Sequence, residues 1–225
     1  MLRRTGSAFF HRTRLKRQAS IFVATAVWLS SVPVAGARTW RVNAEGSGDA
    51  TAIQAGIELA SPGDTVLVAP RTYFESIVLD RNILLASEAG APWTTIDAQG
   101  LDRVVVMTAG VLQGFTIRNG QSPLYFSGGG IYAPSTAHFV QIEHCIIEDN
   151  SADWGDAGLG GGIYAISDSS LIQWNIVRNN GAGLQGGGIY ASGGPFGLEG
   201  WAVVRKNLAG CGKIVSGRLE LPLQG

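Results

Sequence analysis

Apolar and polar residues alternate along most of the chain. Val66 and Val68 are separated by a single residue, and so are Ile77 and Leu79. A period of two is typical of short β-strands that bury one face. Residues that favour turns bound these runs, among them Pro70, Gly90, Gly100, Gly110 and the pair Asn119–Gly120. The pattern predicts many short strands joined by turns, and hence an all-β fold.

One early segment has the period of a helix instead. Within residues 51–60 the apolar side chains recur on a single helical face. We expect Asp49 or Thr51 to cap the start of this helix, and Pro62 and the glycine after it to end it. Such a helix would cover the open end of the first coil of strands, whose backbone groups otherwise lack partners.

A repeat dominates the second half of the chain. The sequence Gly-Gly-Gly-Ile-Tyr occurs three times, at Gly128–Tyr132, Gly160–Tyr164 and Gly186–Tyr190. A short apolar run precedes each copy, and these runs recur at one constant interval, from Ile117 to Ile147 and from there to Val177. A fourth, divergent copy follows at a slightly shorter interval, with Trp201 in the place of Trp174. A fixed period in this range predicts a solenoid of stacked coils.

The repeated residues have expected places in such a coil. Because side chains alternate along a strand, the isoleucine after each glycine triplet should point inward and the tyrosine outward. The glycines should provide turn conformations that other residues avoid. Asn150, Asn180 and Asn207 should stack from coil to coil and hydrogen-bond along the axis.

The first 37 residues differ from the rest. They contain six basic residues and no acidic residue, followed by a short apolar stretch at Ile21–Leu29 and the small residues Ala35–Ala37. This order is typical of a secretory signal peptide, with cleavage after Ala37. The apolar stretch is short for a membrane span, which takes about 20 residues. We therefore predict a secreted or cell-surface protein.

The charge of the chain bears on its binding partners, and its cysteines bear on disulfide bonds. The whole chain has 17 basic and 17 acidic residues, so loss of the leader leaves 17 − 6 = 11 basic and 17 acidic residues, a net charge of −6. Nucleic-acid binding needs a basic surface, so we expect no nucleic acid partner. No further segment is apolar enough for a transmembrane helix. Cys145 and Cys211 form no disulfide framework, and we expect both to be free thiols.

Two sets of segments carry a resemblance to known proteins. The first set comprises Trp40–Val42, Gly46–Gly48, Ile53–Gln54, Pro62–Pro70, Tyr73–Glu75, Thr95–Asp97 and Gly114–Gly120. They resemble the opening of the pectin-lyase-like superfamily, and the glycine-rich units resemble repeats of polymorphic outer-membrane proteins. The resemblance covers nearly all of residues 39–217 and implies a right-handed parallel β-helix with a short capping helix. Arg71 stands where the superfamily usually has glycine, so its turn is expected to be strained or locally changed.

These observations divide the chain into four parts. They are a signal peptide (1–37), an N-terminal strand with the capping helix (38–63), the β-helix coils (64–217), and a tail or truncated end (218–225).

The chemistry of the superfamily does not transfer directly. Its pectate lyases use carboxylate-bound calcium and a basic residue as the proton acceptor, and related hydrolases use clustered aspartates. No stretch of this chain matches either motif, so we assign no catalytic residue and expect no required cofactor. The nearest acidic cluster comprises Glu148, Asp149, Asp153 and Asp156. It is either a calcium site or a solvated acidic turn.

Aromatic residues give a second set of candidates. Tyr132, Tyr164 and Tyr190 occupy equivalent places, as do His144, Trp174 and Trp201, and Trp154 lies in the acidic turn. Flat rings with a polar edge suit sugars and protein interfaces, so Tyr132, Tyr164, Tyr190, Trp154 and Trp174 are candidate ligand contacts. A ladder that only stabilises the coil explains the tyrosines equally well, and the inward or outward direction of the tryptophans is open.

Three functions fit the sequence. The first is a non-catalytic, exported β-helix that binds a polysaccharide or cell-surface glycan. The second is a lyase or glycoside hydrolase acting on acidic polysaccharide, which rests on fold analogy alone. The third is a passenger or fragment of a longer surface protein. The repeats, the aromatic columns and the lack of a catalytic motif favour the first.

Overall fold

The computed structural model describes residues 36–123, 127–152, 157–166, 170–192, 201–209 and 213–220. The chain divides into Met1–Ala35 and a compact unit, Gly36–Gly225, which contains the whole solenoid. Most of the predicted signal peptide therefore lies outside the described residues.

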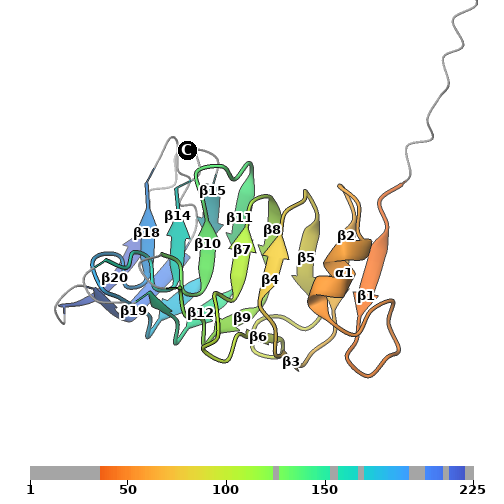
Figure 1. Cartoon of the computed structure of the whole chain (residues 1–225), viewed down its shortest axis with the longest axis horizontal. Helices are drawn as coiled ribbons and strands as arrows, with labels where there is room; N and C mark the ends of the chain where they lie inside the picture. The colour runs from red at the N-terminus through yellow and green to blue at the C-terminus, as the bar shows by residue number, and fades with distance from the viewer. Residues whose placement is uncertain are drawn as a thin grey trace, which may run out of the picture. The chain divides into compact units, whose positions relative to one another are not determined.

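The solenoid is a parallel β-helix of about five turns, as the sequence predicts. Each turn contributes a strand to each of three parallel sheets, so that the sheets run along the stack (Figure 1). Sheet A consists of β1 (Thr39–Val42), β2 (Thr65–Val68), β5 (Leu84–Ser87), β8 (Gly110–Gln113), β11 (Val140–Glu143) and β15 (Ser170–Gln173). Sheet C consists of β4 (Ile77–Leu79), β7 (Val105–Met107), β10 (Ile131–Ala133), β14 (Ile163–Ala165) and β18 (Ile189–Ala191).

Sheet B is the longest of the three. It consists of β3 (Thr72–Tyr73), β6 (Thr95–Asp97), β9 (Thr116–Arg118), β12 (Ile146–Glu148), β13 (Ser151–Ala152), β16 (Ile176–Arg178), β17 (Gly181–Ala182) and β19 (Trp201–Ala209). The register of β16 on β19, with Val177 opposite Val204, confirms the divergent fourth copy. The last strand, β20 (Lys213–Glu220), pairs antiparallel with β19 and therefore departs from the coil pattern.

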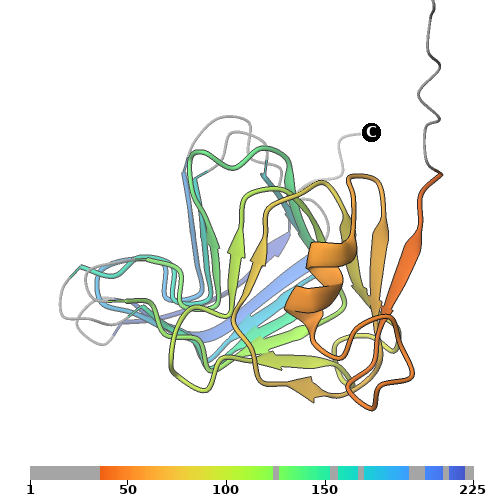
Figure 2. The same ribbon diagram turned by 45° about the vertical axis from the view of Figure 1, so that its right-hand side comes forward.

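The one helix in the described residues, α1 (Ile53–Leu59), covers the N-terminal end of the stack (Figure 2). Ile53 and Ile57 lie on the inner face of α1 and are fully buried, which confirms the apolar face that the sequence predicts. The predicted caps are wrong. The capping position is Ala52, and Glu75 from the next coil accepts hydrogen bonds from the backbone of Ile53 (2.7 Å) and Gln54 (3.0 Å). A carboxylate from another coil thus takes the place of a local cap.

The core runs through the inside of the coils. The alternating residues predicted to point inward, such as Val66, Val68 and Leu79, are completely buried. In the repeats Ile131 and Ile163 are buried, while Tyr132 and Tyr164 are half-buried on the outer face, as predicted. The core of the described coils is almost wholly aliphatic, with Phe115 as its largest fully buried side chain.

The asparagines form the ladder that the sequence predicts. Asn150 donates to the side-chain oxygen of Asn180 in the next coil, and Asn180 donates to that of Asn207, each at 3.0 Å. Each amide also donates to a backbone carbonyl of the preceding coil, from Asn150 to Ile117 (3.0 Å). The ladder is buried, so these amides satisfy backbone groups that water does not reach.

Two physical requirements explain why glycine occupies the triplets: backbone conformation and space. Only the first glycine of each triplet, as at Gly128, has the positive φ that was expected of them. At Gly130 the reason is space, because a Cβ would lie 2.9 Å from the Asn150 amide nitrogen and 2.5 Å from a carbonyl of the next coil. Arg71 has no positive φ and forms an exposed ion pair with Glu45, so the strain expected at its turn is not found.

Replacing Asn150 by alanine should lower the free energy of unfolding by about 3–5 kcal/mol, because the buried Gly120 N–H loses its acceptor, the Ile117 carbonyl loses one donor and the link to Asn180 is broken. Denaturant unfolding followed by circular dichroism measures the change. Asn82, whose side chain is exposed, gives the control: its alanine variant should stay within about 0.5 kcal/mol of the parent. Equal losses in both variants would contradict a structural ladder.

Replacing Glu75 by alanine should destabilise the protein by about 1–2 kcal/mol, because the first amides of α1 lose their acceptor. The matched control is Glu58→Ala, which removes an exposed carboxylate from the same helix. Thermal unfolding compares the two variants, and a Glu75→Ala protein as stable as Glu58→Ala would rule out the cap.

Candidate functional site

The predicted tyrosine column exists on the outer face of sheet C. Tyr132, Tyr164 and Tyr190 lie in register on β10, β14 and β18. Their rings stack in parallel, with centroids 5.4 Å apart between Tyr132 and Tyr164 and 5.5 Å apart between Tyr164 and Tyr190.

This stacking limits what the column can bind. Both faces of the Tyr164 ring are covered by the neighbouring rings, and the guanidinium of Arg103 lies 4.2 Å from the centre of the Tyr132 ring. Tyr132 and Tyr164 therefore present ring edges and hydroxyls rather than flat faces. Burial, together with the neighbouring tyrosines, raises the pKa of Tyr164, so its hydroxyl stays protonated at neutral pH. The geometry favours a stabilising ladder over stacking on a sugar.

Trp174 has a different setting. It lies at the corner between sheets A and B, where His144 and Trp174 each adopt a positive φ. Their side chains stack with centroids 5.0 Å apart, and Trp174 is 44% exposed. Cys145 next to His144 is buried instead, which settles the direction that the sequence left open. The side chain of Trp201 lies outside the described residues.

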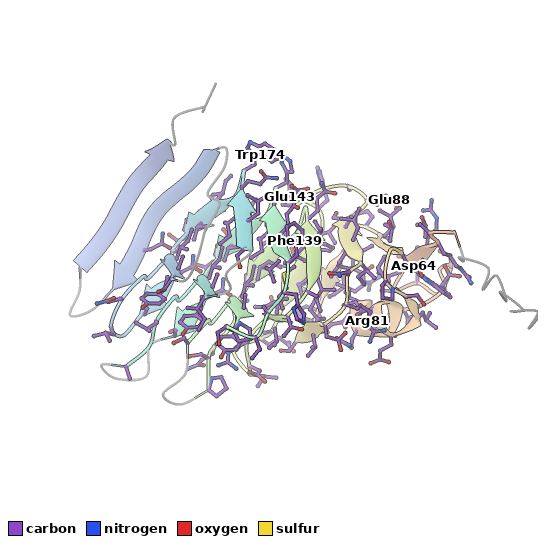
Figure 3. All side chains as sticks on the ribbon, turned by 90° about the horizontal axis from the view of Figure 1, so that it is seen from above. Asp64, Arg81, Glu88, Phe139, Glu143 and Trp174 are labelled. Carbon is purple, nitrogen blue, oxygen red and sulfur yellow. The ribbon has the colours of Figure 1, made fainter. Side chains whose placement is uncertain are left out.

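A ladder of amides and one carboxylate lies beside this pair. Glu143 accepts from Gln113 at 2.7 Å, from Gln141 at 2.7 Å and from Gln173 at 2.6 Å. Gln113, Glu143 and Gln173 end three neighbouring strands of sheet A, so the ladder directly precedes the corner with Trp174 (Figure 3). Glu143 is only 8% exposed, and its hydrogen bonds in the described structure come from neutral amides.

We call Trp174, His144, Gln113, Gln141, Glu143 and Gln173 the corner site. An exposed indole beside carboxamides and a carboxylate combines an apolar face with hydrogen-bonding groups at fixed positions. In an earlier coil the loop between β5 and β6 forms the corner between sheets A and B. This loop contains Trp93, which is 68% exposed. The sequence prediction included Trp174 and missed the other polar members. Their signal was a Gln, a Glu and a Gln at positions 113, 143 and 173, which follow the same constant interval as the apolar runs.

The predicted acidic cluster is only partly described. Asp153, Asp156 and the nearby Trp154 lie outside the described residues. Glu148 receives a hydrogen bond of 2.6 Å from Arg178, within a charged column on sheet B. Asp149 lines an open groove together with Asn119 and Ser151. Among the described residues no three His, Cys, Asp or Glu side chains converge on a metal position, and calcium binding by the cluster stays a prediction.

Comparison with known proteins gives no family for this chain: no family model and no curated protein matches it. The class that the structure establishes is therefore the parallel β-solenoid, and the likeness to particular β-helix families rests on the quoted segments alone.

Replacing Tyr164 by alanine should destabilise the protein by about 1–3 kcal/mol, because two stacked contacts disappear together. Tyr164→Phe keeps both stacks and should remain within about 0.5 kcal/mol of the parent. Thermal and denaturant unfolding measure both. An alanine variant of unchanged stability would mean that the column is no structural ladder.

Proposed function

We propose that this protein is an exported or cell-surface β-helix without catalytic activity, which binds a polysaccharide or cell-surface glycan at the corner site. The observation that carries the proposal is the exposed Trp174 stacked on His144 beside the Gln113–Glu143–Gln173 ladder. Sugars present apolar faces and hydroxyls together, and the corner site offers an aromatic surface and amides in the same place.

The solenoid supports the binding of an extended ligand. The corner recurs in every coil, and adjacent strands of a sheet are about 4.8 Å apart. Trp93 lies at the corner of one coil, Gly114 at that of the next, and His144 and Trp174 at those of the two coils after it. A chain-like glycan lying along the axis would meet several of these positions.

Export is supported by the N-terminal sequence. The basic region, the short apolar stretch and the small residues Ala35–Ala37 stand directly before β1, which begins at Thr39. In the described part of the chain no helix has both the length and the apolar character of a membrane span.

Replacing Trp174 by alanine should weaken glycan binding by roughly 5- to 30-fold, the factor for a loss of about 1–2 kcal/mol of ring contact. The matched control is Phe74→Ala, which removes an exposed ring, 64% accessible, from a loop between sheets B and C. Isothermal titration calorimetry with the polysaccharides that bind in a prior screen gives the affinities. Circular dichroism checks that both variants are folded.

The screen uses neutral and uronate-containing polysaccharides, with and without calcium. Absence of binding to every polysaccharide, or equal affinities for the parent and Trp174→Ala, would contradict the proposal. Growth of the ultraviolet absorbance of unsaturated sugar ends would instead support the alternative, a polysaccharide lyase. In that event the acidic cluster at Glu148, Asp149, Asp153 and Asp156 would be the first target for mutation.

A further inference from the structure

Asp64 gathers three hydrogen-bond donors at the N-terminal end of the solenoid. Its carboxylate accepts from the backbone N–H of Arg38 at 2.8 Å, from the indole of Trp40 at 3.0 Å and from the backbone N–H of Ser61 at 2.9 Å. Asp64 is 8% exposed and lies in the turn before β2. Figure 3 labels it at the orange, N-terminal end of the stack.

One of these donors has a special place in the sequence. Arg38 is the residue that follows Ala37, after which the signal-peptide pattern predicts cleavage. Gly36, Ala37 and Arg38 are all exposed. The nitrogen that Asp64 holds is therefore the nitrogen that cleavage would release as a new N-terminus.

We propose that processing between Ala37 and Arg38 creates an α-ammonium group that pairs with Asp64, so that removal of the leader stabilises the first coil. Hydrolysis adds water across the Ala37–Arg38 peptide bond, which leaves a carboxylate on Ala37 and an amine on Arg38. The amine takes up a proton at neutral pH, and the neutral hydrogen bond to Asp64 becomes a charge-assisted one. Such bonds are roughly twice as strong as neutral ones. The inference rests on the proposed export of the protein.

The surroundings of Asp64 suit an incoming cation. Its three donors are two backbone amides and an indole, which are all neutral before processing. The guanidinium of Arg38 lies 3.5 Å from the centre of the Trp40 ring and 3.6 Å from Asp49. Arg81 binds the Ala60 carbonyl and pairs with Asp80. The hydrogen bonds from Ser61, Arg38 and Trp40 hold the pKa of Asp64 below its usual range, so it is ionised at neutral pH.

The pair predicts a defined pH dependence. An α-amino group has an ordinary pKa of about 7.7–8.0, and the carboxylate raises it in the folded protein. While Asp64 is ionised, the added stability is therefore fully present below about pH 7.5, and it disappears as the pH rises through the raised pKa of the ammonium in the folded state.

The test compares two proteins that differ by a single residue. Residues 38–225 and residues 37–225 are each released from a fusion partner by a protease that leaves no extra residue. Both contain the compact unit with its core, apart from one or two exposed residues at its start. In the longer protein the Arg38 amide keeps its neutral hydrogen bond, and the ammonium moves about 3.8 Å along the chain. At pH 6.5 the Tm of the shorter protein should be higher by about 2–4 °C, and the gap should close above about pH 9.

Two variants show which carboxylate is responsible. Asp64→Asn should abolish the gap between the two N-termini, even if the variant lowers both Tm values, because only the difference within each background is read. Asp49→Asn should keep the gap, since Asp49 faces the guanidinium. Equal Tm values at pH 6.5 in the parent background, or a gap that survives Asp64→Asn, would overturn the inference.

The fate of the full chain in cells separates this inference from the export proposal. We expect N-terminal sequencing of protein recovered outside the cytoplasm to begin at Arg38. A chain processed at another bond would overturn the inference and leave export intact. A chain that keeps all of residues 1–37 and stays inside the cell would overturn the export proposal, and with it the biological role of the ion pair.

Discussion

The structure depends on the hydrogen-bonded register between one coil and the next. A single coil of three short strands cannot satisfy its own backbone groups or bury its apolar residues, so it is stable only against its neighbours. The pairing of β12 with β9 and β16 places equivalent residues of successive repeats directly opposite each other, as with Ile117, Ile147 and Val177. Every other regularity in the molecule follows from this spacing.

The register turns each repeated residue into a column with its own physical role. Inside the bend of sheet B, between β12 and β13 and between β16 and β17, the column is a ladder of asparagines that satisfies buried backbone groups. On the outer face of sheet C it is a stack of tyrosines, and on sheet B it is a series of charges in which Arg178 binds Glu148. The same geometry therefore produces structural ladders and surface patches. Only burial and the accessibility of the ring faces distinguish the two.

The two ends of the stack lack a neighbouring coil and are built differently. At the N-terminal end α1 covers the core, Glu75 binds the first helix amides, and Asp64 holds the start of β1. At the other end of the described chain, β20 folds back antiparallel on β19. At the N-terminal end, α1 and the start of β1 are held by carboxylates of residues that come later in the sequence. These contacts link the start of the described chain to the coils that follow it.

The repeat period, the inward isoleucines, the outward tyrosines and the asparagine ladder could all be predicted from the sequence, because each recurs from coil to coil in the second half of the chain and a strand alternates strictly. The helix at residues 53–59 was predictable from its period, whereas its cap was not, because Glu75 belongs to a different coil. Likewise only the tertiary structure brings Gln113, Glu143 and Gln173 together beside Trp174, and only it shows that stacking covers the tyrosine faces. Local sequence patterns determine the coil. The corner site arises from contacts between side chains a full repeat apart, and no local pattern specifies which side chains make these contacts.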